Sequence, residues 1–199
     1  PSHPTPGIAL PGAEDGGKST FADWLTMTYG NVNTITMTQL SSNENVYVRN
    51  CQFIVIEEAS GKDQRNISAQ EIVDKLKPMV TQTGKKIPSK KLYDNSTEVE
   101  YYGHVIILSN DISPIQMKGE STRWWVRWIG KPEKHDRFVE RLREEVCHFL
   151  YYLDNEFKPS RMESKERLWF NPKEYWTLDK DTAITNNNSK IYSAIKDAI

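Results

Sequence analysis

The chain has 199 residues, the length of one domain or of one domain with a small appendage. Its formal net charge of −1 excludes a protein held on nucleic acid by its overall field, so such a contact requires a local patch. No apolar run reaches the roughly 18 residues that span a membrane and no secretory signal is visible, so we expect no membrane partner and a cytoplasmic location.

The amino-terminal half alternates apolar, β-branched segments with helical ones. The predicted strands are 7–12, 33–40 and 51–59. The last of these is a continuous apolar run, which is typical of a strand buried on both faces of a parallel sheet. The predicted helices are 19–30 and 68–80, and Pro78 should end or kink the second one.

The carboxyl-terminal half continues this alternation. We expect a hairpin over 85–103, strands over 104–110 and 123–130, a helix over 135–157, a polar loop over 185–189 and a terminal helix over 189–199. Apolar residues in the long helix recur at spacings of three and four and should form a buried face: Val139, Leu142, Val146, Phe149, Leu150 and Leu153. Cys51 and Cys147 are too few for a disulfide framework, and their apolar surroundings indicate small core residues in a reducing compartment.

Alternating strands and helices predict an α/β fold in which helices flank a mainly parallel central sheet. We expect a core over 1–132 and a small helical and mixed appendage over 133–199. Ligands of such sheets bind at the carboxyl ends of the strands. Candidate functional residues should therefore follow the predicted strands directly.

A phosphate-binding loop follows the first predicted strand. The sequence GAEDGGKST fits Gly-x-x-x-x-Gly-Lys-Ser and lies between a strand and a helix, the context that this motif requires. Lys18 would contact the β- and γ-phosphates of ATP, and the Ser19 hydroxyl would bind Mg²⁺. The nucleotide-binding residues are Gly12, Ala13, Glu14, Asp15, Gly16, Gly17, Lys18, Ser19 and Thr20. The alternative is a surface glycine turn with a chance lysine.

Polar residues also end the two other buried strands. Glu57 and Glu58 follow FIVI, and a phosphate loop needs such acids, here Glu57 for Mg²⁺ and Glu58 as the base that polarises the attacking water. Asn110 follows VIIL and would orient that water or sense the γ-phosphate. A pair of solvated acids at a strand end remains the alternative.

A lysine cluster lies in the predicted hairpin. Lys85, Lys86, Lys90 and Lys91 fall within seven residues, beside Tyr93. Phosphates of a nucleic acid attract such a cluster, and binding should weaken with salt, while the tyrosine offers a ring for base stacking. The alternative is a solvated, mobile hairpin.

Together, the phosphate loop, FIVIEE, the lysine segment, VIILSN and an arginine before a strand resemble the superfamily 3 helicases, which are AAA+-like ATPases of viruses, phages and plasmids. The likeness covers about residues 7–130 and is strongest to the helicase domain of primase–helicase and primase–polymerase proteins. It implies an ATP-dependent DNA helicase that uses Mg²⁺. It also implies a ring homo-oligomer, usually a hexamer, and an upstream primase or polymerase domain.

The resemblance also implies residue roles. Lys90 or Lys91 would grip single-stranded DNA from a hairpin in the central channel, and Asn110 would be the sensor asparagine. Arg123 would reach the ATP site of the neighbouring subunit, with Arg127 as a rival and an ion pair with Glu120 as the structural alternative. Asp15 departs from the family pattern, in which a glycine is usual, so we expect modest nucleotide affinity.

Other functions compatible with these motifs are a phosphate-loop ATPase acting on RNA, a helicase loader, and a module that binds nucleotide for assembly without unwinding. A small-molecule kinase is a more distant alternative, since it would leave the lysine hairpin without a role. Little of the chain precedes the phosphate loop and it begins with Pro1, so we expect a fragment or a processed product.

Overall fold

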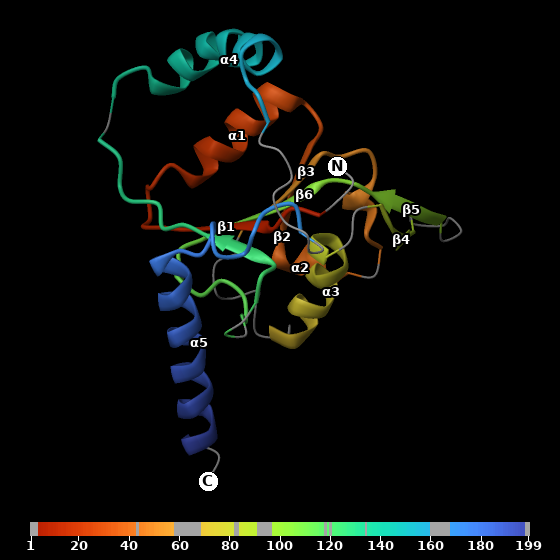
Figure 1. Ribbon diagram of the computed structural model, residues 1–199, viewed down its shortest axis with the longest axis vertical. Helices are drawn as coiled ribbons and strands as arrows, with labels where there is room; N and C mark the ends of the chain where they lie inside the picture. Colours follow the sequence, from red (N-terminus) through yellow and green to blue (C-terminus); the bar gives the residue numbers. More distant parts are fainter. Residues whose placement is uncertain are drawn as a thin grey trace.

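The computed structural model describes residues 4–42, 44–57, 69–81, 84–90, 97–117, 119, 121–133, 135–159 and 168–197. Its centre is a five-stranded sheet in the order β2-β3-β6-β1-β7 (Figure 1). The strands are β1 (Gly7–Pro11), β2 (Val32–Thr36), β3 (Phe53–Glu57), β6 (His104–Ser109) and β7 (Trp124–Val126). Every pair of neighbours is parallel, as predicted.

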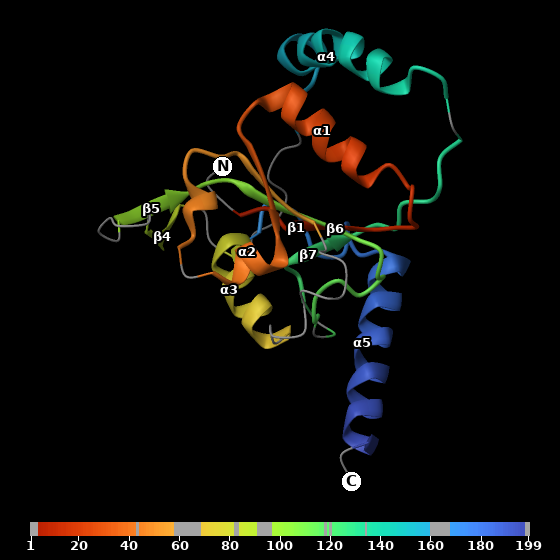
Figure 2. The same ribbon diagram turned by 180° about the vertical axis from the view of Figure 1, so that it is seen from behind.

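Helices cover both faces of this sheet. In Figures 1 and 2, α1 (Lys18–Tyr29) and α4 (Phe138–Asn155) lie on one side, and α2 (Met37–Ser41) and α3 (Ala69–Thr81) lie on the other. The long helix α5 (Leu178–Asp197) begins beside the sheet and extends away from it. A separate antiparallel hairpin of β4 (Lys85–Ser89) and β5 (Thr97–Tyr101) projects from the body.

Alternate residues of the central strands fill two cores. On the α3 face, Ile54 and Ile56 of β3 pack with the apolar side chains of α2 and α3. On the α1 face, Val55 packs with Ala22 and Leu25 of α1. All three β3 side chains are fully buried, because a parallel sheet covered on both faces has no solvent side.

The predicted strand over 33–40 is correct only to Thr36. At that residue the chain turns into α2 through a capping box: Gln39 N donates to Thr36 Oγ1 at 3.2 Å, and Thr36 N donates to Gln39 Oε1 at 2.9 Å. The prediction of a strand gave weight to β-branched residues and missed this Thr-x-x-Gln signal. Pro78 does not end α3 early, since the helix continues to Thr81.

The predicted buried face of α4 is only half-buried. Val139 is 42% exposed and Leu150 is 40% exposed, and Cys147 is also exposed rather than part of a core. The helix packs on α1, where the Trp24 and Phe149 rings lie 5.1 Å apart. Because α1 lies between α4 and the sheet, the apolar face of α4 packs on α1 and does not reach the deep core beside the sheet.

The predicted loop over 185–189 is wrong, because these residues lie inside α5. Tertiary contacts override their low helix propensity. Asn187 is buried and its side-chain amide donates to the Ile115 carbonyl at 3.1 Å, while Ser113 Oγ donates to the Ala183 carbonyl at 3.0 Å. In the described ranges no helix combines the length and the apolar character that crossing a bilayer requires.

A buried lysine lies where α5 joins the sheet. Lys180 is fully buried, and its Nζ has no hydrogen-bond partner among the described residues. It lies 4.2 Å from the centroid of the Trp176 ring. Burial lowers the pKa of Lys180 to about 8. The aromatic face therefore compensates only partly for the water that this ammonium group loses.

Replacing Lys180 with methionine should remove a pH dependence of stability. With a pKa of about 8 in the folded chain and about 10.4 in the unfolded chain, the unfolded state binds more protons between these values. The free energy of unfolding should therefore rise with pH in this window, by at most about 3 kcal/mol. Urea unfolding at pH 7.5 and 9.5 measures the rise.

The difference between wild type and Lys180→Met isolates this residue. Burial raises the pKa of Cys51 to about 11, and its ionisation lowers stability with pH, but both proteins share that effect. An equal pH dependence in the two proteins would contradict the assignment.

Candidate nucleotide-binding site

The predicted phosphate loop joins β1 to α1 at the carboxyl edge of the sheet. Gly12 N donates to the Ser109 carbonyl at 2.9 Å, which ties the start of the loop to the end of β6. Gly12 also bridges Ile129, beyond β7. A Cβ atom on Gly12 would lie 2.6 Å from the Ile129 carbonyl oxygen, so no other residue fits without a backbone shift. The loop is thus held from both neighbouring strands.

The carboxyl end of the loop forms an open amino terminus for α1. Gly17 is the N-cap residue, with φ of 81°, and gives no side-chain hydrogen bond to the first turn. A Cβ at Gly17 would meet nothing within 4 Å. Backbone N–H groups at such a terminus, aided by the helix dipole, bind phosphate. This cradle fits the phosphate groups of a nucleotide.

Lys18 folds back over the loop. Its Nζ donates to the carbonyls of Gly12 at 3.0 Å and Ala13 at 2.6 Å. The ammonium group is therefore held against the backbone at the start of the loop. Ser19, the next residue, is exposed and available to a metal ion.

Asp15 adopts a left-handed conformation, with φ of 60°. Only glycine adopts this region without strain, although Asp and Asn tolerate it better than other residues. The structure thus shows a backbone conformation that favours glycine and that an aspartate tolerates at some cost. The Glu14 and Asp15 side chains are exposed.

The polar residues at the ends of β6 and β3 lie at the same edge of the sheet as the loop, as expected for parallel strands. Strand β6 lies between β1 and β3, Pro11 is level with Ser109, and Leu108 is level with Glu57. The carboxyl ends of three adjacent strands thus lead to the loop, to Asn110 and to Glu57. Glu58 lies outside the described residues.

Sequence reasoning missed how the turn after β6 is held. Asp111 N donates to Ser109 Oγ at 2.9 Å, and Ser113 N donates to the Asp111 carboxylate at 3.0 Å. These local bonds fix the backbone on either side of Asn110. The Ser-Asn-Asp-x-Ser pattern was the available signal, because such residues bond to nearby backbone in turns.

Arg123 lies at the opposite edge of the sheet. Its carbonyl accepts a hydrogen bond from Gly7 N at 2.8 Å, at the start of β1, and its Nε donates to Thr81 Oγ1 at 3.2 Å. The five residues of β1 separate it from the phosphate loop, or about 17 Å at about 3.3 Å per residue. Glu120, its alternative ion-pair partner, lies outside the described residues. Arg127 is exposed, and its backbone N–H bonds to the Ala9 carbonyl at 3.0 Å.

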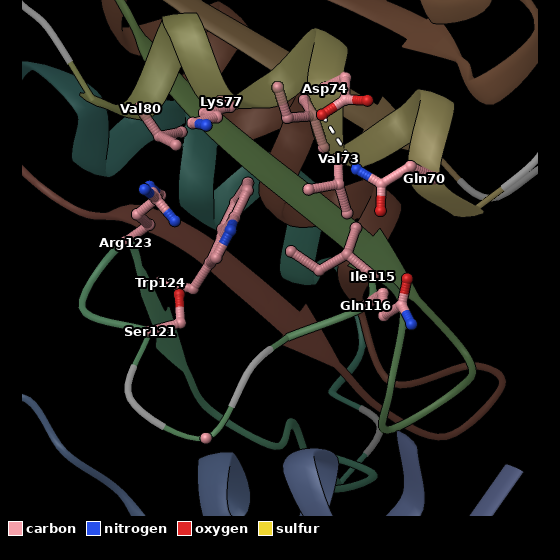
Figure 3. Close-up of a pocket in the computed structure, with 12 residues that line it drawn as sticks. Gln70, Val73, Asp74, Lys77, Val80, Ile115, Gln116, Ser121, Arg123 and Trp124 are labelled. Atoms are coloured by element: carbon pink, nitrogen blue, oxygen red, sulfur yellow. Dashed lines mark hydrogen bonds between the residues drawn. The ribbon is translucent and has the colours of Figure 1, made fainter. Parts of the chain in front are cut away.

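A cavity of about 630 Å³ lies between α3 and the segment 115–124, and we call it the α3 cavity (Figure 3). Its apolar wall includes Val73, Val80, Ile115 and Trp124. Its charged side chains are Arg123, Lys77 and Asp74, and the Asp74 carboxylate accepts a hydrogen bond from the Gln70 amide at 3.0 Å. In Figure 3, Arg123 and Trp124 lie across from the helix that carries Lys77. Sequence reasoning did not predict this cavity.

The hairpin of β4 and β5 carries the lysine cluster, as expected. Lys86 is exposed and lies 3.6 Å from Glu98, an exposed ion pair of little energetic weight. Lys90 is exposed, and its N–H donates to the Glu44 carbonyl at 2.7 Å. The Lys85 side chain, Lys91 and Tyr93 lie outside what the structure describes. Glu98 and Glu100 reduce the positive charge of this surface, which sequence spacing alone did not reveal.

Arg49 anchors this hairpin to the body. Its Nε donates to Ser89 Oγ at 2.8 Å, and its Nη2 donates to the Ser89 carbonyl at 2.9 Å and to Thr97 Oγ1 at 2.7 Å. Ser89 and Thr97 face each other across the two strands. Arg49 itself follows the short 3₁₀ helix η1 (Val46–Val48). Nothing in the local sequence marks this arginine, because its partners are 40 and 48 residues away.

The residues present also fit Mg²⁺. The Ser19 hydroxyl and the Glu57 carboxylate are oxygen donors, which this ion prefers, and bound phosphates supply the rest of its coordination. Within the described ranges no cluster of three or more His, Cys, Asp or Glu side chains could hold a metal by itself. A metal here would therefore bind together with the nucleotide.

Comparisons with known proteins agree with this architecture. The model of a family of unknown function, DUF5906, matches residues 10–124, which include the phosphate loop, Glu57, Asn110 and Arg123. No curated protein matches the sequence significantly.

Among solved structures, the A form of the apo NrS-1 C-terminal region aligns with a TM-score of 0.72 at 17% identity, over 92% of this chain and 42% of that one. Another apo structure of this region, residues 305–718, gives 0.71 at 18% identity, over 91% and 42%. A JCV helicase aligns at only 0.45 and 13% identity, over 96% and 53%, and carries no argument. The likeness to the NrS-1 region establishes a shared fold, and this chain spans less than half of that region's length.

Proposed function

Since this chain belongs to the family of unknown function DUF5906, its activity has to be inferred from its site, and we propose that it is the ATP-hydrolysing motor of a DNA helicase or translocase. One observation carries this proposal: three adjacent strands end in the phosphate loop, Asn110 and Glu57, in that order. A phosphate cradle with a neighbouring acid and a polar sensor is what nucleoside-triphosphate hydrolysis requires. The alternative of a chance glycine turn accounts for none of this order.

In this proposal the chain's own residues bind and orient the triphosphate. Lys18 exchanges its bonds to the Gly12 and Ala13 carbonyls for the β- and γ-phosphates, and the first turn of α1 donates backbone N–H groups. Ser19 and Glu57 hold Mg²⁺, which when bound neutralises charge on the phosphates. Asn110 orients the attacking water, and Glu58 is the proposed base.

Arg123 acts on the site of a neighbouring copy. Its position at the amino edge of the sheet puts its own phosphate loop beyond the reach of one side chain. An arginine so placed supports a ring in which each ATP site is completed by the next subunit, and we propose a hexamer by resemblance. The lysines of the β4–β5 hairpin grip single-stranded DNA in this arrangement.

The test is ATP hydrolysis measured against protein concentration, with and without single-stranded DNA, and with RNA of the same sequence. A rate per subunit that rises with concentration and with DNA supports a ring-forming DNA motor. A larger stimulation of hydrolysis by RNA than by DNA would mean that the motor acts on RNA. A rate per subunit that stays at background level at every protein concentration, with or without DNA, would contradict the proposed motor function.

The strained Asp15 favours a second candidate, a module that binds nucleotide for assembly without turnover. This candidate predicts saturable binding of ATP and ring formation with no release of phosphate. The same concentration series, followed by nucleotide binding as well as by phosphate release, separates the two functions.

Replacing Arg49 with methionine should weaken the stimulation of ATP hydrolysis by DNA. The variant loses three hydrogen bonds that fix the hairpin, while the phosphate loop is untouched. DNA-stimulated hydrolysis should fall about tenfold, as expected when hydrogen bonds of a charged group worth about 1.5 kcal/mol are lost. Basal hydrolysis should stay at the wild-type rate.

Arg141→Met, at an exposed position on α4, is the matched control and should keep its DNA stimulation. If Arg49→Met loses basal and stimulated rates equally, Arg49 supports the whole fold rather than the hairpin.

A further inference from the structure

The proposed function leaves one feature of the phosphate loop unexplained. Glu14 and Asp15 are both exposed, and within the described part of the chain neither is in an ion pair. Two carboxylates beside a phosphate site raise the negative potential and oppose binding of an anion. The loop backbone accommodates these two residues, but it does not compensate the charge of their carboxylates.

The α3 cavity carries the complementary charge. It contains Arg123 and Lys77, and among the charged lining residues that the structure describes only Asp74 is negative (Figure 3). Neither cation is in an ion pair with a residue that the structure describes, and the Arg123 guanidinium donates a hydrogen bond to the Thr81 hydroxyl. Lys77 is exposed on α3. The acidic loop and Arg123 cannot meet within one chain, because the loop follows the carboxyl end of β1 and Arg123 lies beside Gly7 at its amino end.

Complementary surfaces on opposite sides of a molecule produce a head-to-tail contact between copies. We propose that Glu14 and Asp15 of one copy dock at the mouth of the α3 cavity of the next, beside Lys77 and Arg123. This inference rests on the proposed function, since it uses the same orientation of neighbours that takes Arg123 to the ATP site. The partner is a second copy of this chain.

The contact links nucleotide affinity to assembly. In an isolated subunit the acid pair weakens binding of ATP, and in the assembled ring the partner's cations neutralise it. Assembly then tightens nucleotide binding, and by reciprocity nucleotide tightens assembly. The unusual acids thereby reduce ATP binding outside the ring. The apolar wall of the cavity, which includes Trp124 and Val80, gives the docked loop a surface to cover.

Charge reversal tests the contact. Glu14→Lys and Lys77→Glu should each raise the protein concentration of half-assembly about tenfold, since each replaces attraction by repulsion across the contact. A chain with both changes restores opposite charges at every interface and should assemble within about twofold of wild type. Sedimentation velocity with a non-hydrolysable ATP analogue measures assembly, and Lys173→Glu, outside the cavity, is the control for a surface lysine.

A second readout separates this role from a structural one. Glu14→Gln should bind a fluorescent ATP analogue about threefold more tightly than wild type at concentrations where both are monomers, and yet assemble more weakly. A folding defect would weaken both. Thermal unfolding of each variant confirms that the fold is intact.

The outcomes distinguish this inference from the function. If the wild type assembles but the single charge reversals have no effect, the proposed docking is wrong. The same holds if the double variant does not restore assembly. In both cases the proposed motor function still stands. A wild type that binds the analogue but never assembles overturns both the docking and the shared ATP site. Weak single variants with a restored double variant support the docking.

Discussion

Replacing Lys18 with alanine should abolish ATP hydrolysis, with a fall in rate of at least about 100-fold, the usual effect of removing one preorganised group that stabilises transition-state charge. The lysine is the one cation of the phosphate loop, and it lies against the Gly12 and Ala13 carbonyls, within reach of an entering phosphate. The measurement is phosphate release at saturating ATP, with protein at the concentration that gives the highest rate per subunit.

Lys75→Ala is a matched control for this variant. Lys75 also donates to two backbone carbonyls, those of Ser41 at 3.0 Å and Ser42 at 2.5 Å, but on the opposite face of the sheet. It should keep hydrolysis near the wild-type rate after correction for the folded fraction. Equal losses in both variants would mean that loop packing, rather than phosphate contact, sets the rate.

Replacing Arg123 with alanine should lower hydrolysis by about 1,000-fold, the lower end of the range for an arginine supplied in trans. Binding of ATP to the isolated subunit should be unchanged, because the arginine lies at the far edge of its own sheet. Hydrolysis and fluorescent-nucleotide binding, measured on the same preparation, check the two expectations.

Mixing provides the sharper test of Arg123. Arg123→Ala and Lys18→Ala subunits are each inactive, but random mixing at equal amounts gives about a quarter of head-to-tail interfaces with both residues intact. Activity should therefore return on mixing. Arg127→Ala, the rival arginine, should behave as wild type; a rate loss in Arg127→Ala with rescue by mixing would move the role to Arg127, and no rescue at any ratio would exclude action in trans.

Much of the central architecture was predictable because its signals are local. Strands β1, β3 and β6 are short apolar runs, and α1 begins at the lysine of a recognisable loop and ends at Tyr29, with Gly30 as its C-cap. The relation among Gly12, Glu57 and Asn110 then follows from parallel topology. The sequence therefore sufficed to bring the candidate residues together at one edge of the sheet, where we propose a nucleotide site.

The features that were missed depend on distant partners. Asn187 is helical and buried because it reaches the Ile115 carbonyl, and Cys147 is exposed because α1 keeps α4 away from the sheet. Arg49 anchors residues that lie 40 or more positions away. The α3 cavity is formed by two separate segments. Hydrophobic periodicity predicts which face of a helix is apolar, but not what covers that face.

The anchoring of the β4–β5 hairpin has a mechanical consequence. Asn33 of β2 donates to the Tyr47 carbonyl of η1 at 2.6 Å, and Arg49, directly after η1, holds Ser89 and Thr97. The hairpin base is thus linked through η1 to the edge of the central sheet. A lever attached in this way turns with the body that carries it. In the proposed ring, the stroke that moves DNA would therefore equal the rotation of the whole subunit, and the bending stiffness of the hairpin would contribute little to the step length.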